Sequence, residues 1–271
     1  MSADTPHYII IGGGTSGLVV ANRLSDDPAN NVLVIEAGAD MTADPRVNIP
    51  ALWTTLMGSE ADWQYETVDQ PGLKGRAVKE PQGKALGGSS AINGQAFIAP
   101  AQADIDAWET LGNKGWNWAN MVPFYKKSYT ITPPKDQETL DHLGIDWISE
   151  EHRGTDGPIK VSFPGVVQNP LCKAWIDAFK GLNKITTGDP MSGNSIGGYS
   201  NTATVDIATK TRSYAGSAHG IPLLQKPNVT VLTNAKVQKI TFDNAGSDNV
   251  TATGVEVIVG GETKTYKAGK E

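Results

Sequence analysis

Three glycines and one carboxylate near the N-terminus have the types and spacing of a nucleotide-binding turn. The glycines are Gly12, Gly14 and Gly17, and the carboxylate is Glu36. In such a turn the first glycine permits a tight bend, the second lets the backbone approach a pyrophosphate, and the third lets a helix pack closely on a strand. Glu36 can accept hydrogen bonds from ribose hydroxyls, and its charge disfavours a 2′-phosphate. The pattern predicts dinucleotide binding and argues against NADP.

The segments around this motif have the strand–helix–strand order that the motif requires. Residues 8–11 and 31–36 are short apolar runs rich in β-branched side chains, which is typical of buried parallel strands. Between them, Leu18, Ala21 and Leu24 have the spacing of one helical face directed toward a sheet. The N-terminus of this predicted helix offers N–H groups and a partial positive charge to a phosphate.

A second glycine-rich loop covers residues 83–100 and reads Gly-Lys-Ala-Leu-Gly-Gly-Ser-Ser-Ala-Ile-Asn-Gly-Gln-Ala-Phe-Ile-Ala-Pro. Its small side chains let the backbone pass close to a flat ligand, and its N–H and O–H groups can donate to that ligand. FAD and NAD both fit the first motif. A long irregular segment after Glu36-Ala-Gly38 favours FAD, because an NAD domain more often continues directly into further strand–helix units.

The composition excludes several classes of protein. The chain has 271 residues and a net charge of −6, which argues against nucleic acid as a partner. No apolar run approaches the roughly 20 residues needed to cross a bilayer, so no membrane span is expected. Cys172 is the single cysteine, which excludes an intramolecular disulfide and argues against a cysteine-ligated metal site; no metal site is assigned.

The cellular location is left open by the sequence. The first residues lack the basic and apolar regions of a signal peptide, so the protein is either intracellular or has lost a leader. Asn228 and Asn249 begin Asn-x-Thr sequons, which predict a glycoprotein if the chain is secreted and favour an extracellular location.

The two glycine motifs together resemble the glucose–methanol–choline (GMC) oxidoreductases, most closely the fungal branch of glucose oxidase and FAD-glucose dehydrogenase. The match to the family's first signature consists of Gly83, Lys84, Leu86, Gly87, Gly88, Ser89, Ser90, Ile92, Asn93, Phe97, Pro100 and Asp106. The segment Asp62-Trp-Gln-Tyr65 agrees with the family as well. The resemblance implies an α/β fold (α+β overall), in which a substrate domain is inserted into a Rossmann-like FAD-binding domain that is incomplete in this chain.

The resemblance also implies domain boundaries and contacts. Residues 1–155 are expected to form the first part of the FAD domain, 156–222 the start of the substrate domain, and 223–271 the return to the FAD domain. Besides the glycines and Glu36, the residues that fall where family members contact FAD are Thr15, Ser16, Ser89, Asn93, Gly94, Ala96 and the backbone at Val237. Ile92 stands where choline oxidase has a histidine bonded to the flavin, so noncovalent FAD is expected.

The activity implied is oxidation of an alcohol or sugar CH–OH group by hydride transfer to flavin N5. The alternative is a flavin-containing lyase or cyclase of the same family that acts on a secondary metabolite. The histidines are His7, His142, His152 and His219, and each is expected at the surface rather than in catalysis. No catalytic residue is assigned. The base is expected in a C-terminal remainder of the same polypeptide, either continuous with this chain or present as a separate chain, since this chain stops after a predicted β-ribbon.

The remaining segments are predicted from local pattern. Helices are expected at 103–111, 116–128 and 170–182, the last with Leu171, Trp175 and Phe179 on one apolar face. Strands are expected at 157–162, 197–204, 228–242, 252–259 and 264–266.

Overall fold

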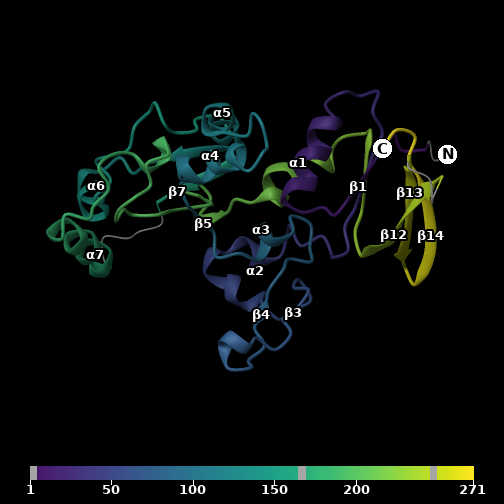
Figure 1. Cartoon of the computed structure of the whole chain (residues 1–271), viewed down its shortest axis with the longest axis horizontal. Coiled ribbons are helices and arrows are strands. Elements are labelled where there is room, and N and C mark those ends of the chain that lie inside the picture. Colours follow the sequence, from purple (N-terminus) through teal and green to yellow (C-terminus); the bar gives the residue numbers. More distant parts are fainter. Residues whose placement is uncertain (1–4, 164–168, 245–248) are drawn as a thin grey trace. The chain divides into compact units, whose positions relative to one another are not determined.

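The computed structural model describes residues 5–163, 169–244 and 249–271. The chain divides into two compact units, each with its own core (Figure 1). Unit 1 contains residues 1–94 and 214–271, and unit 2 contains residues 95–213. None of the helices in the described ranges is long and apolar enough to span a membrane.

Unit 1 is built on a parallel sheet with helical turns around it. Its strands are β1 (Tyr8–Ile11), β2 (Val32–Ile35), β3 (Tyr65–Glu66), β4 (Lys79–Glu80), β11 (Val229–Leu232), β12 (Ala235–Asp243), β13 (Thr251–Val259) and β14 (Glu262–Lys267). Its helices are α1 (Thr15–Leu24), α2 (Pro45–Asn48), α3 (Ser89–Ile92) and α8 (Ile221–Leu223), with 3₁₀ turns at Pro50–Thr55 and Pro71–Leu73 and a π-helical turn at Gly216–Gly220.

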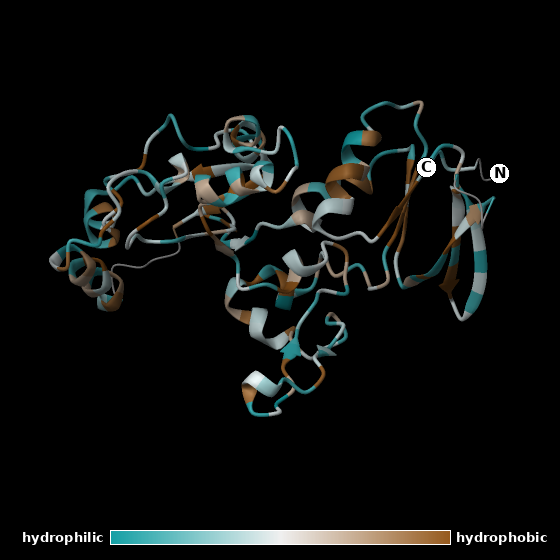
Figure 2. Cartoon of the chain, in the orientation of Figure 1, coloured by the Kyte–Doolittle hydropathy of each residue, from teal (hydrophilic) through white to brown (hydrophobic). Residues whose placement is uncertain are grey.

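Strand β2 is the centre of unit 1 and is buried on both faces. It pairs in parallel with β1 on one side and β11 on the other. Because side chains alternate along a strand, Val32 and Val34 pack against α1, whereas Leu33 and Ile35 pack against the antiparallel ribbon β12–β13–β14. Figure 1 shows α1 and this ribbon on opposite sides of the sheet, and Figure 2 shows the sheet strands as hydrophobic.

The predicted strand–helix–strand unit is confirmed. β1 has the predicted bounds, and Leu18 and Ala21 of α1 are fully buried against the sheet. The single strand predicted over 228–242 is wrong, because the chain turns at Asn234 and forms two strands there. Asn234 has a left-handed φ of 52°, and its N–H donates to the Gly38 carbonyl at 2.8 Å.

Unit 2 contains a four-stranded mixed sheet, in the order β5–β8–β7–β6, and a short hairpin. Its strands are β5 (Ala96–Phe97), β6 (Tyr129–Thr132), β7 (Ile159–Ser162), β8 (Thr202–Ala203), β9 (Val205–Asp206) and β10 (Thr211–Arg212). Its helices are α4 (Gln102–Thr110), α5 (Trp118–Ser128), α6 (Gln137–Leu143) and α7 (Pro170–Gly181), with a 3₁₀ turn at Pro190–Ser192. The core joins Tyr129, Ile131 and Val161 with side chains from the connecting loops.

Packing divides the chain differently from the predicted boundaries of 155 and 222. Residues 95–155 belong to unit 2, because β6 pairs with β7 over four residues and Tyr129 and Ile131 lie in the unit 2 core. The return to unit 1 begins at Tyr214, which packs in a unit 1 cluster together with Ile92.

Helix α7 differs from the predicted amphipathic helix in the face that it buries. Leu171 and Trp175 are 73% and 62% exposed, while Ile176 on the other side is buried. Cys172 is half-buried and packs against the unit 2 core. Leu171 and Trp175 of the predicted apolar face therefore lie at the surface of unit 2, whereas Phe179 of the same face is half-buried.

Asn228, the first residue of one sequon, has a structural role. Its side-chain Nδ2, the atom that glycosylation modifies, donates to the carbonyls of Ser25, Asp27 and Asn30 at 3.1, 3.2 and 2.9 Å. These bonds fix the loop between α1 and β2 to the start of β11.

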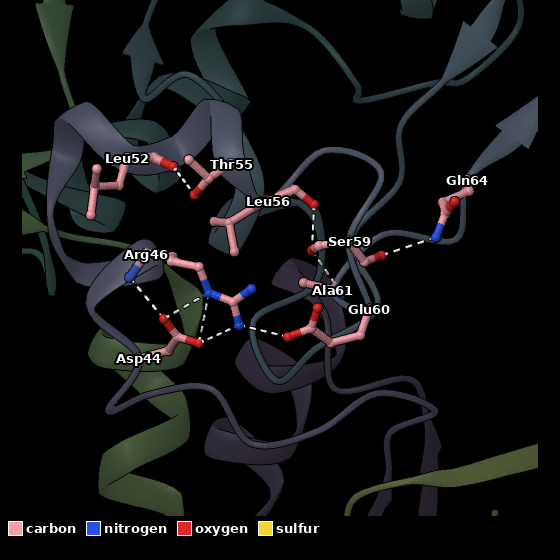
Figure 3. A network of polar contacts seen from close by, with 9 residues as sticks. All are labelled: Asp44, Arg46, Leu52, Thr55, Leu56, Ser59, Glu60, Ala61 and Gln64. Carbon is pink, nitrogen blue, oxygen red and sulfur yellow. Dashed lines mark hydrogen bonds and ion pairs between the residues drawn. The ribbon is translucent and has the colours of Figure 1, made fainter.

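The irregular segment after β2 is held by charged side chains (Figure 3). Asp44 caps α2 by accepting from the Arg46 N–H at 2.8 Å, and its carboxylate also pairs with the Arg46 guanidinium. Arg46 pairs with Glu60 as well, at 2.6 Å. The hydrogen bonds from Arg46 hold the pKa of Asp44 below its ordinary value.

Asp62 fixes the end of this segment next to the second glycine loop. Its Oδ1 accepts from the N–H groups of Gln64 and Gln82 at 2.9 and 3.0 Å, and its Oδ2 accepts from Gly58 at 2.9 Å. Burial alone would raise the pKa of Asp62, but the three N–H donors outweigh that effect and hold the pKa below its ordinary value.

We expect Asp62→Asn to lower the free energy of unfolding by about 1–3 kcal/mol at pH 7, because an amide NH₂ would face the Gly58 N–H. The lowered pKa means that the Asp62 contribution is present above the unfolded-state pKa and is lost as pH falls through the folded-state value. Urea unfolding at neutral and acid pH measures both effects. Asp40→Asn, at an exposed turn, is the control and should change stability by less than about 0.5 kcal/mol. Equal stability of Asp62→Asn and wild type would contradict this role.

Candidate functional site

The first glycine motif forms a tight turn between β1 and α1. Gly12 has a left-handed φ of 95°, and its N–H donates to the Ile35 carbonyl at 2.8 Å. A Cβ on Gly17 would overlap the carbonyl oxygen of Gly12 and press on Ile10, so α1 can approach the strand only if residue 17 is glycine. The roles predicted for Gly12 and Gly17 are thus confirmed as backbone geometry.

The second glycine loop packs directly on the first, backbone against backbone. The Gly87 N–H donates to the Gly13 carbonyl at 2.7 Å. Gly88 has a φ of 55°, and a Cβ there would lie 2.7 Å from the Cα of Gly14. The second loop therefore leaves no room for a side chain at position 88, and the two motifs form one surface.

Glu36, directly after β2, bonds the first glycine loop and the start of the irregular segment. Its Oε2 accepts from the Gly13 N–H and its Oε1 from the Gly38 N–H, each at 2.8 Å. The residue is 5% exposed. Burial raises the pKa of Glu36 above its ordinary value, and the donors at Gly38 and Gly13 offset only part of that rise. Each carboxylate oxygen has a further lone pair that can accept a ligand hydroxyl.

A cavity of about 490 Å³ lies over these loops within unit 1. The predicted site residues that line it are Gly12, Gly14, Thr15, Ser16, Gly17, Glu36, Ser89 and Val237. Gly14, the residue before α1, provides no side-chain cap, so the N–H groups of the first turn are available to an anion. The cavity combines hydrogen-bond donors at the α1 N-terminus with a carboxylate acceptor.

Three predicted residues are not part of this cavity lining. Asn93 is exposed at the end of α3, and Gly94 follows it beside the ring of Trp53. Ala96 belongs to β5 of unit 2. The FAD contacts predicted for these three residues stay predictions, as do those predicted for the residues that line the cavity.

Ser89 lines the cavity but is also used inside its own loop. Its hydroxyl accepts from the Gly83 N–H and donates to the side chain of Gln82, each at 3.0 Å. These bonds hold the start of the second loop, at Gln82 and Gly83, against Ser89. The approach is so close that a Cβ on Gly83 would overlap the Gly88 carbonyl.

Trp63 and Lys236 line the cavity and were not predicted. The ammonium groups of Lys236 and Lys84 lie 5.7 and 5.1 Å from the centre of the Trp63 ring, within range of cation–π attraction. The sequence contained a signal for Trp63, because Asp62-Trp-Gln-Tyr65 matches a family segment. Lys236 had no signal, since an exposed lysine on a strand is ordinary.

The prediction that every histidine lies at the surface is wrong for two of them. His142 and His219 are buried. His142 Nε2 lies 2.9 Å from the Asn169 carbonyl, where α6 meets the start of α7. His219 sits in the π-helical turn beside α1, and burial, together with the charge of Arg23, lowers its pKa. Both have packing roles that local sequence did not indicate.

No group of His, Cys, Asp and Glu residues in the described ranges is arranged to hold a metal ion.

Residues 6–271 match the family described as GMC oxidoreductase. Two curated relatives agree over almost the whole chain. Dehydrogenase citC of Monascus ruber is 36% identical over 268 residues, covering 97% of this chain and 42% of the relative. Oxygen-dependent choline dehydrogenase of Sinorhizobium medicae (strain WSM419) is 36% identical over 273 residues, covering 100% of this chain and 45% of the relative. The chain belongs to the GMC oxidoreductase family.

A solved structure agrees with the fold. The FAD-dependent oxidoreductase from Chaetomium thermophilum superimposes with a TM-score of 0.87 at 32% sequence identity, covering 97% of this chain and 44% of that chain. The predicted fold class is thereby confirmed. The chain spans less than half the length of these relatives.

We expect Gly17→Ala to destabilise unit 1 by at least about 1–3 kcal/mol, because its methyl group would overlap the Gly12 carbonyl. Thermal unfolding measures this. Gly72→Ala is the matched control: a Cβ there meets nothing within 4 Å, so stability should not fall. Equal melting temperatures for the two variants would show that the close packing of α1 on the strand does not require glycine at position 17.

Proposed function

We propose that the cavity in unit 1 holds the ADP half of noncovalently bound FAD. The α1 N-terminus would bind the pyrophosphate, and Glu36 would accept from the ribose hydroxyls. The observation that carries this proposal is the joint surface of the two glycine loops, which presents backbone with no side-chain bulk. A Cβ on Gly14 would touch only Gly88, at 3.8 Å, so the cavity side of this turn is open to a ligand. The cavity volume of about 490 Å³ is in the range of known cofactor sites.

Noncovalent attachment is supported by the position of Ile92. Its side chain is buried in an apolar cluster with Ala91, Met41 and Val47. An isoleucine carries no nucleophile that could form a bond to a flavin.

We further propose that the whole protein oxidises an alcohol or sugar. FAD, when bound, supplies the acceptor for the hydride of the CH–OH carbon. This chain's contribution is to bind and orient the cofactor through the two loops. The second candidate, a lyase or cyclase that keeps FAD as structure, rests on the shared fold alone and has no observation in its favour here.

The catalytic base is proposed to lie in a C-terminal segment of the same polypeptide. The relatives are more than twice as long as this chain. The large exposed side chains of unit 2, such as Leu171 and Trp175, suit burial by such a segment. The same segment would complete the substrate site.

An anaerobic experiment tests the activity. A panel of alcohols and sugars is added to the FAD-loaded protein with and without the C-terminal segment, and flavin absorbance is followed. The proposal expects bleaching only when the segment is present. Turnover without a change in absorbance would favour the lyase. Bleaching of the chain alone would contradict the placement of the base.

We expect Glu36→Gln to weaken FAD binding by about 1.5–3 kcal/mol, through loss of a charge-assisted contact. Wild-type affinity should fall as pH drops through the raised pKa of Glu36, because the ribose hydroxyls bind the ionised form. The variant should lack this dependence. FAD titration by quenching of flavin fluorescence, between neutral and acid pH, measures both effects.

Glu60→Gln is the matched control for this variant. Glu60 is a surface carboxylate that pairs with Arg46, and FAD affinity should not change when it is replaced. A Glu36→Gln protein with wild-type affinity at every pH would refute the ribose contact.

A further inference from the structure

The ring of Tyr214 fills a space between two glycines from different segments. Tyr214 is 2% exposed. A Cβ on Gly87, in the second glycine loop, would lie 2.5 Å from Cε2 of the ring, and a Cβ on Gly216 would lie closer still. The flat ring thus occupies the room that both glycines leave by lacking a side chain.

Gly87 makes the hydrogen bond that joins the second loop to the first. It has a left-handed φ of 103°, and its N–H makes the 2.7 Å bond to the Gly13 carbonyl. Gly88, directly after it, lies against Gly14. A shift of Gly87 would therefore change the backbone that lines the cavity on both loops.

Ser90 adds a second connection between the same two segments. Its hydroxyl donates to the Gly87 carbonyl at 2.5 Å and accepts from the Ala215 N–H at 3.2 Å. Ala215, the residue after Tyr214, is thereby hydrogen-bonded to the second glycine loop, against which the Tyr214 ring packs.

Tyr214 is itself held in place by the turn that follows it. Its N–H donates to the Ser217 hydroxyl at 3.0 Å, and its carbonyl accepts from the Ala218 N–H at 2.8 Å. The residue that carries the ring is therefore hydrogen-bonded to the π-helical turn. Such turns are frequent at functional sites, although they are rare elsewhere.

We propose that Tyr214 is a positioning residue for the cofactor, because its ring holds Gly87 in the conformation that joins the two glycine loops. Tyr214 does not line the cavity, so it acts through Gly87 and not by touching the ligand. A backbone that is already in its bound conformation loses less entropy on binding, which favours affinity. The inference rests on the proposed binding of FAD.

The test compares Tyr214→Leu with Tyr214→Phe in the purified protein, by FAD titration and thermal unfolding. Tyr214→Leu should raise the dissociation constant for FAD about tenfold, the size of loss that supporting residues cause at metal sites. Tyr214→Phe keeps the ring and should bind FAD with nearly the wild-type affinity. Tyr129→Leu, at a buried tyrosine of unit 2, is the control and should lower thermal stability without changing FAD affinity.

Two failures are distinguishable in this experiment. A wild-type protein that binds no FAD would overturn the proposed function. A wild type that binds FAD, together with Tyr214→Leu that binds it equally tightly, would overturn the positioning role alone. Should Tyr214→Leu not fold, Tyr214→Met fills the space with a flexible side chain. Tyr214→Met should then bind FAD more weakly than wild type. Binding of FAD by Tyr214→Met with wild-type affinity would overturn the inference.

Discussion

The contact between two glycine loops is the constraint on which the rest of unit 1 depends. Gly87 donates to Gly13, and Gly88 lies against Gly14 without room for a side chain. Three segments must reach this contact in compatible conformations. They are the turn between β1 and α1, the long irregular segment after β2, and the segment that begins at Tyr214. Asp62, Glu36 and Tyr214 support it from different directions, each through backbone N–H groups or a glycine. The cavity is thus a property of backbone placement more than of side-chain chemistry.

Glu36 shows how one residue serves the fold and the site together. Its carboxylate bonds Gly13 and Gly38 while it lines the cavity, and burial raises its pKa. A buried carboxylate with two donors still has lone pairs for ribose hydroxyls, and these would also favour the ionised form. Binding of a dinucleotide would therefore relieve part of the cost of burying the charge.

The sequence predicted the parts of the site that follow from local periodicity and glycine spacing. β1, the buried face of α1 and the turn at Gly12 belong to this group, since each depends on neighbouring residues. It could not predict that Asn234 breaks a long strand, that His142 and His219 are buried, or that residues 95–155 pack with unit 2. These depend on pairing partners far along the chain. Lys236 was missed for the same reason, because only the fold places it beside Trp63.

The most direct measurement of the central claim is competition for the site by the two halves of FAD. Apoprotein is titrated with FAD in the presence of ADP or of FMN. Since the cavity joins an anion-binding helix terminus to a ribose acceptor, ADP is expected to compete with FAD and FMN is not. Competition by FMN with no effect of ADP would contradict the assignment of the two glycine loops and Glu36 to the ADP half.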